Sequence, residues 1–403
     1  MFFKQILIIL IPKPIDFLTE NMKKKSYHYS KKSNFNGKFR PFVIISFIIL
    51  VFFLAAGGYY LKRKLAKPDT YKPTEKTNLI EITEIIKNAE KIEVREPGNS
   101  ALLPGAKWVP QTFNNCAPAT TSMILQYFGY NVGQDVTKAD LRTNDDDKNV
   151  FTYEIRDYLK SKYDIESKLF YNGDVNRIKT LLVNGFYVLL EDWLHPNEDI
   201  GHVTILRGFD DEQGVFIADD SYIGVNIVYK YDEFDSTQWK AFNREYLPIY
   251  KAELEKLLME IVGEDGDEET MYRKAVERAK TEIAENDRDM YAYFNLGTSY
   301  FALGQYEEAR EAFEKSRALG WPRRMLWYQI QPVQTLNQLG EYRQAIELAD
   351  IGLVGNDSFA ELHVEKARSY IGLGETEKAK QEVEKAIYYS PNLVSAREIL
   401  ESL

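Results

Sequence analysis

The sequence is poor in the residues that bind metals and cross-link chains. Its 403 residues include one cysteine, Cys116, and four histidines. A single cysteine excludes an intramolecular disulfide and a zinc site built from several cysteines. Because the histidines are isolated and the acidic residues are scattered, we expect neither a metal site nor a cofactor.

Two further features narrow the function. The chain lacks a Gly-x-x-x-x-Gly-Lys-Ser/Thr loop, the motif that binds nucleotide phosphates, so ATP-driven export is not expected. The net charge is −10, and the basic residues gather in residues 1–67, which hold 13 basic and two acidic side chains. The rest is strongly acidic, which argues against a nucleic-acid partner because phosphate binding needs a basic surface.

Residues 41–61 are predicted to form a transmembrane helix. They carry no charge, and at about 1.5 Å per residue they are long enough to cross roughly 30 Å of hydrocarbon. Flanking basic side chains are more numerous on the N-terminal side. The positive-inside bias therefore predicts a basic cytoplasmic segment over residues 1–40 and places everything after residue 61 outside the cell membrane.

The alternative is a cleaved signal peptide, since Ala55-Ala56-Gly57 offers small residues at a suitable place. The length of the apolar run and the Lys62-Arg63-Lys64 stop favour an anchor. Met22, followed by three lysines, is a natural start, so we expect residues 1–21 to be an over-extended gene start. Residues 62–100, charged and interrupted by prolines, are predicted to be a stalk or plain linker.

Residues 101–250 mix helical and strand periodicity, which predicts an α+β domain. Apolar residues at helical spacing predict helices over 116–128, 151–163 and 174–184. Runs of β-branched and aromatic residues predict strands over 186–190, 203–206, 214–218, 225–229 and 246–250.

Cys116 is predicted to lie on the first turn of a helix. Asn114 and Asn115 before it are good caps, and Pro118 suits a first turn but not a helix interior. The free N–H groups and the positive end of the helix dipole favour the thiolate there and lower the pKa of a thiol from about 8.5. A lone cysteine is more often a small buried hydrophobe, but this position favours a nucleophile.

A thiolate nucleophile needs a base, and His202 is the preferred candidate. It opens a predicted strand, whereas His195 reads as a loop residue and is the weaker choice. His28 lies before the predicted membrane span and His363 lies in the C-terminal helices. Asp219, at the end of the next predicted strand, could fix the tautomer of His202, although a solvated turn is an equal reading of Asp219-Asp220.

These motifs resemble the family-39 cysteine peptidases, the papain-like, bacteriocin-processing type, and their transporter-free relatives. The resemblance covers roughly residues 103–250 and rests on Gln111, Asn115-Cys116-Ala117-Pro118-Ala119, Gly201-His202 and Ala218-Asp219. It implies a papain-like fold with Cys116 as nucleophile, His202 as general base and then acid, Asp219 orienting His202, and Gln111 helping to stabilise the oxyanion. Ala117 stands where the family usually has Gly, and Asp220 where it has Pro, so Asp220 stays open as the third member.

Residues 251–403 are predicted to form an all-α tetratricopeptide-repeat array. Gly304, Gly340 and Gly374 recur in similar Leu-Gly segments at a spacing close to 34 residues. The middle repeat is degenerate, with Pro332 where a helix residue is expected. A helix is predicted to precede the array over 268–285 and another to cap it over 393–402. Four aromatic residues are conceivable groove residues or core packing: Tyr291, Tyr293, Trp327 and Tyr328.

The sequence therefore predicts a membrane-anchored, outward-facing cysteine peptidase that hydrolyses a peptide or protein substrate. Its repeats would bind that substrate or a partner protein. The alternative is a catalytically inactive peptidase-like protein that acts as a surface protein-binding scaffold. A cell-wall amidase would use the same residues, but such enzymes usually carry Asp-Cys rather than Asn115-Cys116.

Overall fold

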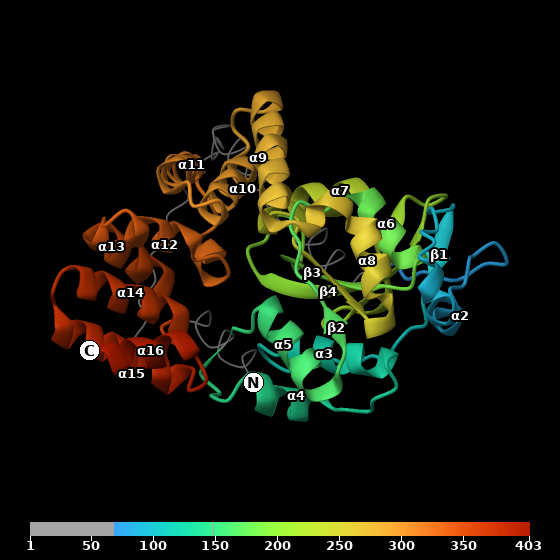
Figure 1. Ribbon diagram of the computed structural model, residues 1–403, viewed down its shortest axis with the longest axis horizontal. Coiled ribbons are helices and arrows are strands. Elements are labelled where there is room, and N and C mark those ends of the chain that lie inside the picture. The colour runs from blue at the N-terminus through green and yellow to red at the C-terminus, as the bar shows by residue number, and fades with distance from the viewer. Residues whose placement is uncertain (1–67, 148) are drawn as a thin grey trace, which may run out of the picture. The chain divides into compact units, whose positions relative to one another are not determined.

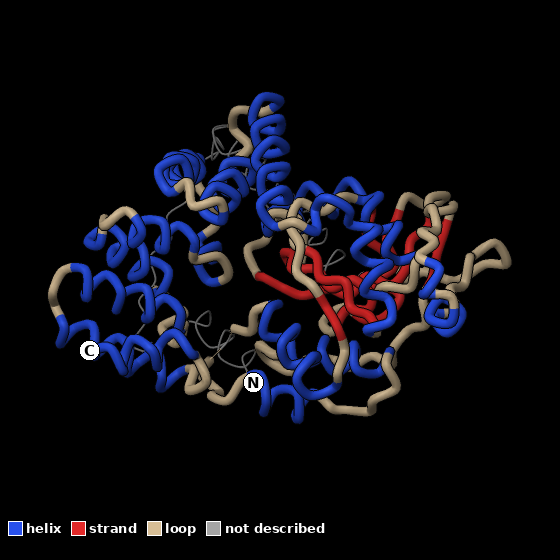
Figure 2. The backbone as a smooth tube through the Cα atoms, in the orientation of Figure 1, coloured by secondary structure: helices blue, strands red, loops and turns tan. Residues whose placement is uncertain are grey.

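The computed structural model describes residues 68–147 and 149–403 (Figure 1). The predicted cytoplasmic segment 1–40 and membrane span 41–61 lie outside the described residues. Within the described ranges, no helix has the length and apolar character needed to cross a bilayer. The predicted α+β domain followed by an all-helical array is confirmed. Figure 2 shows every strand of the described residues in one domain and only helices and loops in the other.

The first domain contains seven strands and the helices that pack on them. The strands are β1 (Ser100–Leu102), β2 (Glu166–Ser167), β3 (Tyr187–Trp193), β4 (Gly201–Asp210), β5 (Val215–Asp220), β6 (Gly224–Lys230) and β7 (Tyr246–Tyr250). The α-helices are α2 (Ile82–Lys87), α3 (Cys116–Tyr127), α4 (Gln134–Leu141), α5 (Thr152–Tyr163), α6 (Val175–Val183), α7 (Tyr231–Thr237) and α8 (Glu255–Val262). Short 3-10 turns occur at η1 (Ala89–Lys91), η2 (Trp239–Phe242), η3 (Ala252–Leu254) and η4 (Gly263–Gly266).

The strands form one antiparallel sheet in the order β2-β7-β3-β4-β5-β6, with β1 paired to β4. The central strands β3, β4 and β5 are almost entirely buried. Helix α3 packs against β4, and α6 packs against β1, β3 and β4. The three predicted helices and the five predicted strands of this domain are confirmed, with boundaries that differ by a few residues.

The prediction of a free stalk is wrong for the described part of residues 62–100. Thr70 forms a β-bridge with Ile227, and Leu79 forms one with Leu102. Ile80 and Ile85 are 4% exposed and belong to the main core. These contacts make residues 69–99 a part of the domain and not a spacer.

The second domain is a stack of helix pairs. It consists of α9 (Glu268–Glu285), α10 (Met290–Ala302), α11 (Tyr306–Leu319), η5 (Arg323–Trp327), α12 (Gln331–Gln338), α13 (Tyr342–Leu353), α14 (Ala360–Gly372), α15 (Thr376–Tyr389) and α16 (Val394–Ser402). Each of α10, α12 and α14 packs against the helix that follows it. Gly304 and Gly374 make the turns within two pairs with a φ of +72°, a conformation that favours glycine.

The degenerate second repeat departs from the regular pattern at its first helix. Pro332 occupies the first turn of α12, where proline is tolerated, so α12 is short and begins late. The preceding residues form η5 and the segment Tyr328–Ile330 instead of a helical turn. This irregular segment, residues 320–330, faces the first domain.

The two domains share a hydrophobic cluster. Trp193 and Phe242 from the first domain pack with Phe294, Phe313 and Met325 from the repeats. Trp193 Nε1 also donates a hydrogen bond of 2.8 Å to the hydroxyl of Tyr291. The repeats are therefore joined to the first domain by a hydrophobic core as well as by the connecting chain.

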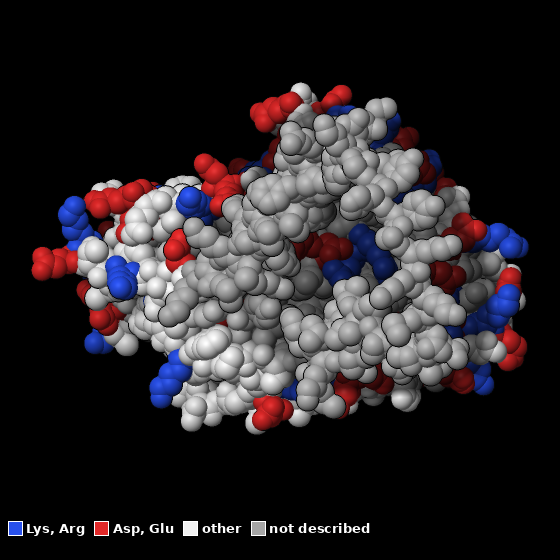
Figure 3. Space-filling view, turned by 180° about the vertical axis from the view of Figure 1, so that it is seen from behind, with Lys and Arg blue, Asp and Glu red and all other residues white. Residues whose placement is uncertain are grey.

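The charged side chains of the surface do not separate by sign. In the face shown in Figure 3, acidic and basic side chains are interspersed along the described surface.

Candidate active site

Cys116 is the first residue of α3, as predicted. The residue before it, Asn115, is fully buried, but its side chain makes no capping hydrogen bond. Its amide instead donates to Gln134 Oε1 at 3.1 Å and accepts from Arg142 Nη1 at 3.2 Å. Asn114 takes a φ of +54°, a left-handed conformation that asparagine tolerates. The two asparagines thus fix the loop that delivers the thiol to the helix N-terminus.

His202 lies at the start of β4 and contacts both Asp220 and Cys116. Its Nε2 is 3.0 Å from Asp220 Oδ2, and the two side chains are 2% and 0% exposed. Burial lowers the pKa of His202, but the negative charge of Asp220, its hydrogen bond and the contact with the Cys116 side chain outweigh burial and hold that pKa well above its usual range. The arrangement favours an imidazolium beside the thiol.

Asp220 is built to stay ionised. Its Oδ1 accepts hydrogen bonds of 2.7 Å from the backbone N–H groups of Tyr222 and Ile223, and its Oδ2 accepts one of 3.1 Å from the Tyr229 hydroxyl. Burial raises the pKa of this carboxyl, but the interactions with His202 and the two backbone N–H groups lower it below its usual range.

The expectation that Asp219 contacts His202 is wrong. Asp219 accepts from Arg207 Nε at 3.0 Å, from the Tyr127 hydroxyl at 2.8 Å and from two backbone N–H groups, those of Ala106 and Asn226. In the β4–β5 pairing, Asp219 is opposite Ile205. Because side chains alternate along a strand, Asp220 and not Asp219 projects to the side that His202 occupies.

Gln111 reaches the same place from the loop before α3. Its backbone N–H donates to Ser221 O at 2.9 Å, and its Oε1 accepts from the Ser221 hydroxyl at 2.9 Å. These bonds leave the Nε2 amino group with no hydrogen-bond partner among residues 68–147 and 149–403. The structure therefore brings together Gln111, Cys116 and His202 of the predicted site and replaces Asp219 by Asp220.

A cleft with a volume of about 440 Å³ opens on the thiol. Gln111, Cys116 and His202 line it from the first domain. Trp327, Tyr328 and Asn356 line it from the repeats. Other lining residues are largely apolar and include Phe113, Val150, Leu194, Ile200 and Tyr222. The cleft is thus a composite of both domains.

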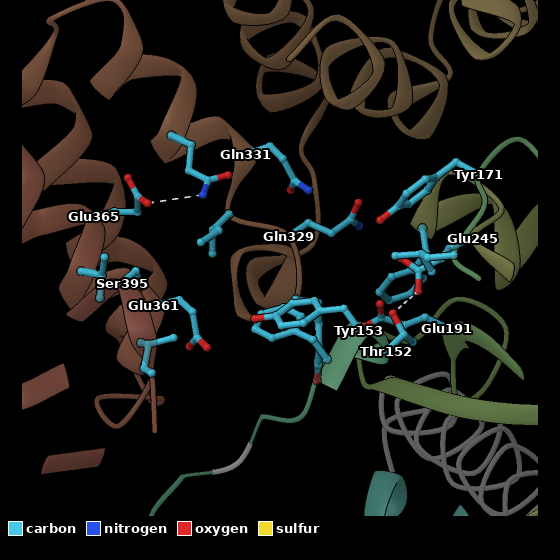
Figure 4. A pocket seen from close by; sticks show the side chains of 18 of the residues that line it. Thr152, Tyr153, Tyr171, Glu191, Glu245, Gln329, Gln331, Glu361, Glu365 and Ser395 are labelled. Atoms are coloured by element: carbon cyan, nitrogen blue, oxygen red, sulfur yellow. Dashed lines mark hydrogen bonds between the residues drawn. The ribbon is translucent and has the colours of Figure 1, made fainter. Parts of the chain in front are cut away.

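A second cavity of about 300 Å³ adjoins the cleft and shares Phe151, Glu191 and Tyr328 with it. Figure 4 shows carboxyl groups converging on this cavity from both domains. Burial raises the pKa of Glu245 to about 7 and that of Glu361 to about 8, and it raises the pKa of Glu191 well above the usual range. The cavity next to the thiol therefore contains carboxyl groups that hold their protons near neutral pH.

Sequence reasoning missed Asp192, which is opposite His202 in the β3–β4 pairing. It is 1% exposed, neither of its carboxyl oxygens has a partner within the described chain, and burial raises its pKa to about 8. An acidic residue inside a buried apolar strand was the signal that could have found it. The sequence suggests a groove of the repeats or core packing for Trp327 and Tyr328, whereas the structure places both in the cleft that contains Cys116.

Comparison with known proteins agrees with this division of the chain. Residues 104–247 match the model of the Peptidase_C39 like family, and residues 290–319 and 360–393 match tetratricopeptide-repeat models. No match was found among curated proteins.

Several solved structures are similar to parts of this chain. A double glycine motif protease from an AMS/PCAT transporter, solved in complex with the leader peptide, is 19% identical and covers 36% of this chain and 92% of its own, with a TM-score of 0.29. The match to MamA is 20% identical and covers 32% of this chain and 74% of the MamA chain, with a TM-score of 0.30. The match to a tetratricopeptide-repeat protein of Thermus thermophilus is 23% identical and covers 37% of this chain and 79% of the Thermus chain, with a TM-score of 0.28. The chain carries a Peptidase_C39-like domain followed by tetratricopeptide repeats.

Proposed function

We propose that this protein is a cysteine peptidase whose nucleophile is Cys116. The observation that carries the proposal is the buried His202–Asp220 pair, 3.0 Å apart, in contact with a cysteine on the first turn of α3. A nucleophile, a base and a group that orients the base are the three parts of a thiol hydrolase site. The match of residues 104–247 to the Peptidase_C39 like family supports the same chemistry.

In the proposed reaction, the thiolate sulfur of Cys116 attacks the carbonyl carbon of a peptide bond. The carbonyl π-electrons move to its oxygen, which the Gln111 Nε2 group and the Cys116 backbone N–H stabilise. His202 then gives its proton to the amine as the C–N bond breaks, leaving an acyl-thioester on Cys116. A water molecule then gives a proton to His202 and attacks the thioester carbonyl. The C–S bond breaks, the carboxylic acid product leaves, and Cys116 and His202 return to the thiolate and imidazolium forms. Asp220 holds the ring of His202 throughout.

The test is the pH profile of Cys116 alkylation by iodoacetamide in the full-length protein. Since Cys116 is the only cysteine, all alkylation reports on this site. We expect an apparent pKa well below the roughly 8.5 of a free thiol, and a higher value in His202→Ala. His195→Ala, which changes the other histidine of the domain, is the matched control and should keep the native profile. If native protein and His202→Ala both titrate like a free thiol, the scaffold alternative is favoured.

We also propose that residues 41–61 anchor the protein in the cell membrane with both folded domains outside. The charge-free apolar run and the basic excess before it support this topology. The lone cysteine makes the test direct, because any label that a membrane-impermeant thiol reagent leaves on this protein, isolated after treatment of intact cells, is on Cys116. Labelling of intact cells equal to that of permeabilised cells is expected. Labelling only after permeabilisation would place the domains inside.

The repeats support protein–protein interaction, and we propose that they help to bind the substrate or a partner protein. Part of their surface is already used, since α10 and η5 supply residues that pack on Trp193 and Phe242. The Trp327-Tyr328 pair, considered above for a groove of the repeat array, lines the cleft of the peptidase-like domain instead. The repeats therefore act on the site itself as well as on any external partner.

A further inference from the structure

The irregular segment of the second repeat reaches into the cleft. Residues 320–330 stand where a regular repeat would begin its first helix, and they place Trp327 and Tyr328 in the cleft that contains the thiol. Tyr328 is close enough to Cys116 and Glu191 for their charges to affect it, although burial is the main cause that raises its pKa. A residue that lies about 200 positions after the nucleophile is thus a part of the nucleophile's surroundings.

The ring of Tyr328 lies directly on Gly201, the residue before the candidate base. A Cβ atom built on Gly201 would be 2.4 Å from Cε1 and 2.6 Å from Cζ of Tyr328. No residue larger than glycine fits under the ring in this position, so the strand that carries His202 and the ring of Tyr328 are in van der Waals contact.

Contacts on both sides hold this segment in place. Arg324 Nη1 pairs with Asp199 Oδ1 at 2.5 Å, and Gln329 Nε2 donates to Ala241 O at 2.8 Å. The side-chain amide of Asn149 donates to Trp327 O. The indole of Trp193 meets the Tyr328 ring edge to face, with centroids 5.6 Å apart. The ring is therefore a fixed wall and not a free surface side chain.

Tyr328 also stands where the two cavities meet. It lines both the cleft of about 440 Å³ that contains Cys116 and the cavity of about 300 Å³ that contains the carboxyl groups. Among the described residues, only Phe151 and Glu191 share this position with it. Removing the ring would join the two spaces on the side of the repeats, so its size sets how far a bound side chain can extend from the thiol.

We propose that Tyr328 is a specificity-determining residue, through which the repeat domain limits the size of the substrate side chain that binds next to Cys116. The inference rests on the proposed peptidase function, because it assigns the substrate-binding role of the same cleft. It implies that the substrate is a peptide with a small or slender side chain at this position. A bulky aromatic group would meet the ring of Tyr328 and be rejected.

The test compares two reagents on Cys116 in the full-length protein at one pH. Iodoacetamide is small, and tosyl-phenylalanine chloromethyl ketone carries an aromatic side chain next to its reactive carbon. The measured quantity is the ratio of the bulky to the small rate constant. Loss of a contact of this size changes discrimination by about tenfold or more, so we expect the ratio to rise at least that much in Tyr328→Ala. Tyr328→Phe keeps the ring and should restore the native ratio.

The control is Tyr388→Ala, which removes a tyrosine of the repeats that is 64% exposed and lies outside both cavities. It should leave the ratio unchanged. Tyr328→Leu provides a second variant if the alanine variant does not fold, and we expect an intermediate ratio. An unchanged ratio in a folded Tyr328→Ala or Tyr328→Leu variant overturns the proposal. Because a ratio cancels the thiolate fraction, it tests the cleft separately from the pH profile that tests the peptidase chemistry.

Discussion

Asp220 Oδ2 lies 3.0 Å from His202 Nε2, whereas the neighbouring Asp219 is bonded to Arg207 and Tyr127. Two consecutive carboxylates thus serve opposite sides of one strand. Both are fully buried, so neither is a solvated turn residue. Because the two carboxylates have different partners, an aspartate-to-asparagine substitution should affect the reactivity of Cys116 at position 220 and the stability of the fold at position 219.

Asp220→Asn should weaken the reactivity of Cys116. Without the carboxylate, burial dominates and the pKa of His202 falls, so less of the thiol is held as a thiolate beside an imidazolium. We expect the rate of alkylation by iodoacetamide at pH 6 to drop by at least about tenfold, the equivalent of one pKa unit. A rate equal to that of the native protein would show that Asp220 does not support the reactivity of Cys116.

Asp219→Asn should instead weaken the fold. It breaks a fully buried ion pair with Arg207, and loss of one partner of such a pair costs about 3–5 kcal/mol. We expect the free energy of unfolding, measured by urea denaturation, to fall by that amount. The pH dependence of alkylation in the folded variant should stay close to the native one. A stable Asp219→Asn variant with an inactive thiol would return Asp219 to the catalytic role that the family resemblance implied.

Gly201→Ala should destabilise the junction of the two domains. The new methyl group would lie 2.4 Å from the Tyr328 ring, and overpacking of this kind costs about 1–3 kcal/mol. In a Tyr328→Ala background the methyl group has room, so the cost should largely disappear. Urea denaturation of the two single variants and the double variant measures the coupling. Additive effects would show that the ring does not rest on Gly201.

Glu361→Gln should stabilise the protein at alkaline pH. Burial, assisted by the nearby charges of Glu154 and Asp147, raises the pKa of Glu361 from 4.5 to about 8. Its protonated form favours the folded state, so stability is fully present below about pH 4.5 and is lost as the pH rises towards 8.

The amide variant lacks this loss, and one pKa unit corresponds to about 1.4 kcal/mol. The gain over native protein in unfolding free energy should therefore be more than about 1 kcal/mol larger at pH 9 than at pH 4. Glu377→Gln, at an exposed position of the repeats, is the control and should show no such difference. An equal gain at both pH values would contradict the assignment.

The parts of the site that depend on local sequence could be predicted. Cys116 begins a helix, as its place just before Pro118 predicts, because proline is tolerated in a first turn but not in a helix interior. His202 lies at the start of a strand, as predicted. The choice between Asp219 and Asp220 could not be made, because it depends on how β5 pairs with β4, where the register shifts between Leu206 and Gly208. Strand pairing is a long-range property that residue spacing does not contain.

The position of Tyr328 in the cleft could not be predicted from the sequence either. Degeneracy of the second repeat, visible at Pro332, marked the segment as unusual but not the direction in which it extends. The predicted stalk is wrong for a related reason, since the charges and prolines of residues 62–100 do not show that the domain covers Ile80 and Ile85. Contacts between distant segments decide all three features.

The shared cluster of Trp193 and Phe242 with Phe294 and Met325 also limits how the protein can be divided. Cutting the chain between β7 and α9 would expose Trp193 and Phe242 on a fragment that keeps Cys116, His202 and Asp220 but loses the residues of the repeats that line the cleft. Such a fragment should aggregate and react indiscriminately. The repeats thus complete the cleft that contains Cys116, and exchanging them for those of another protein would change the shape of that cleft.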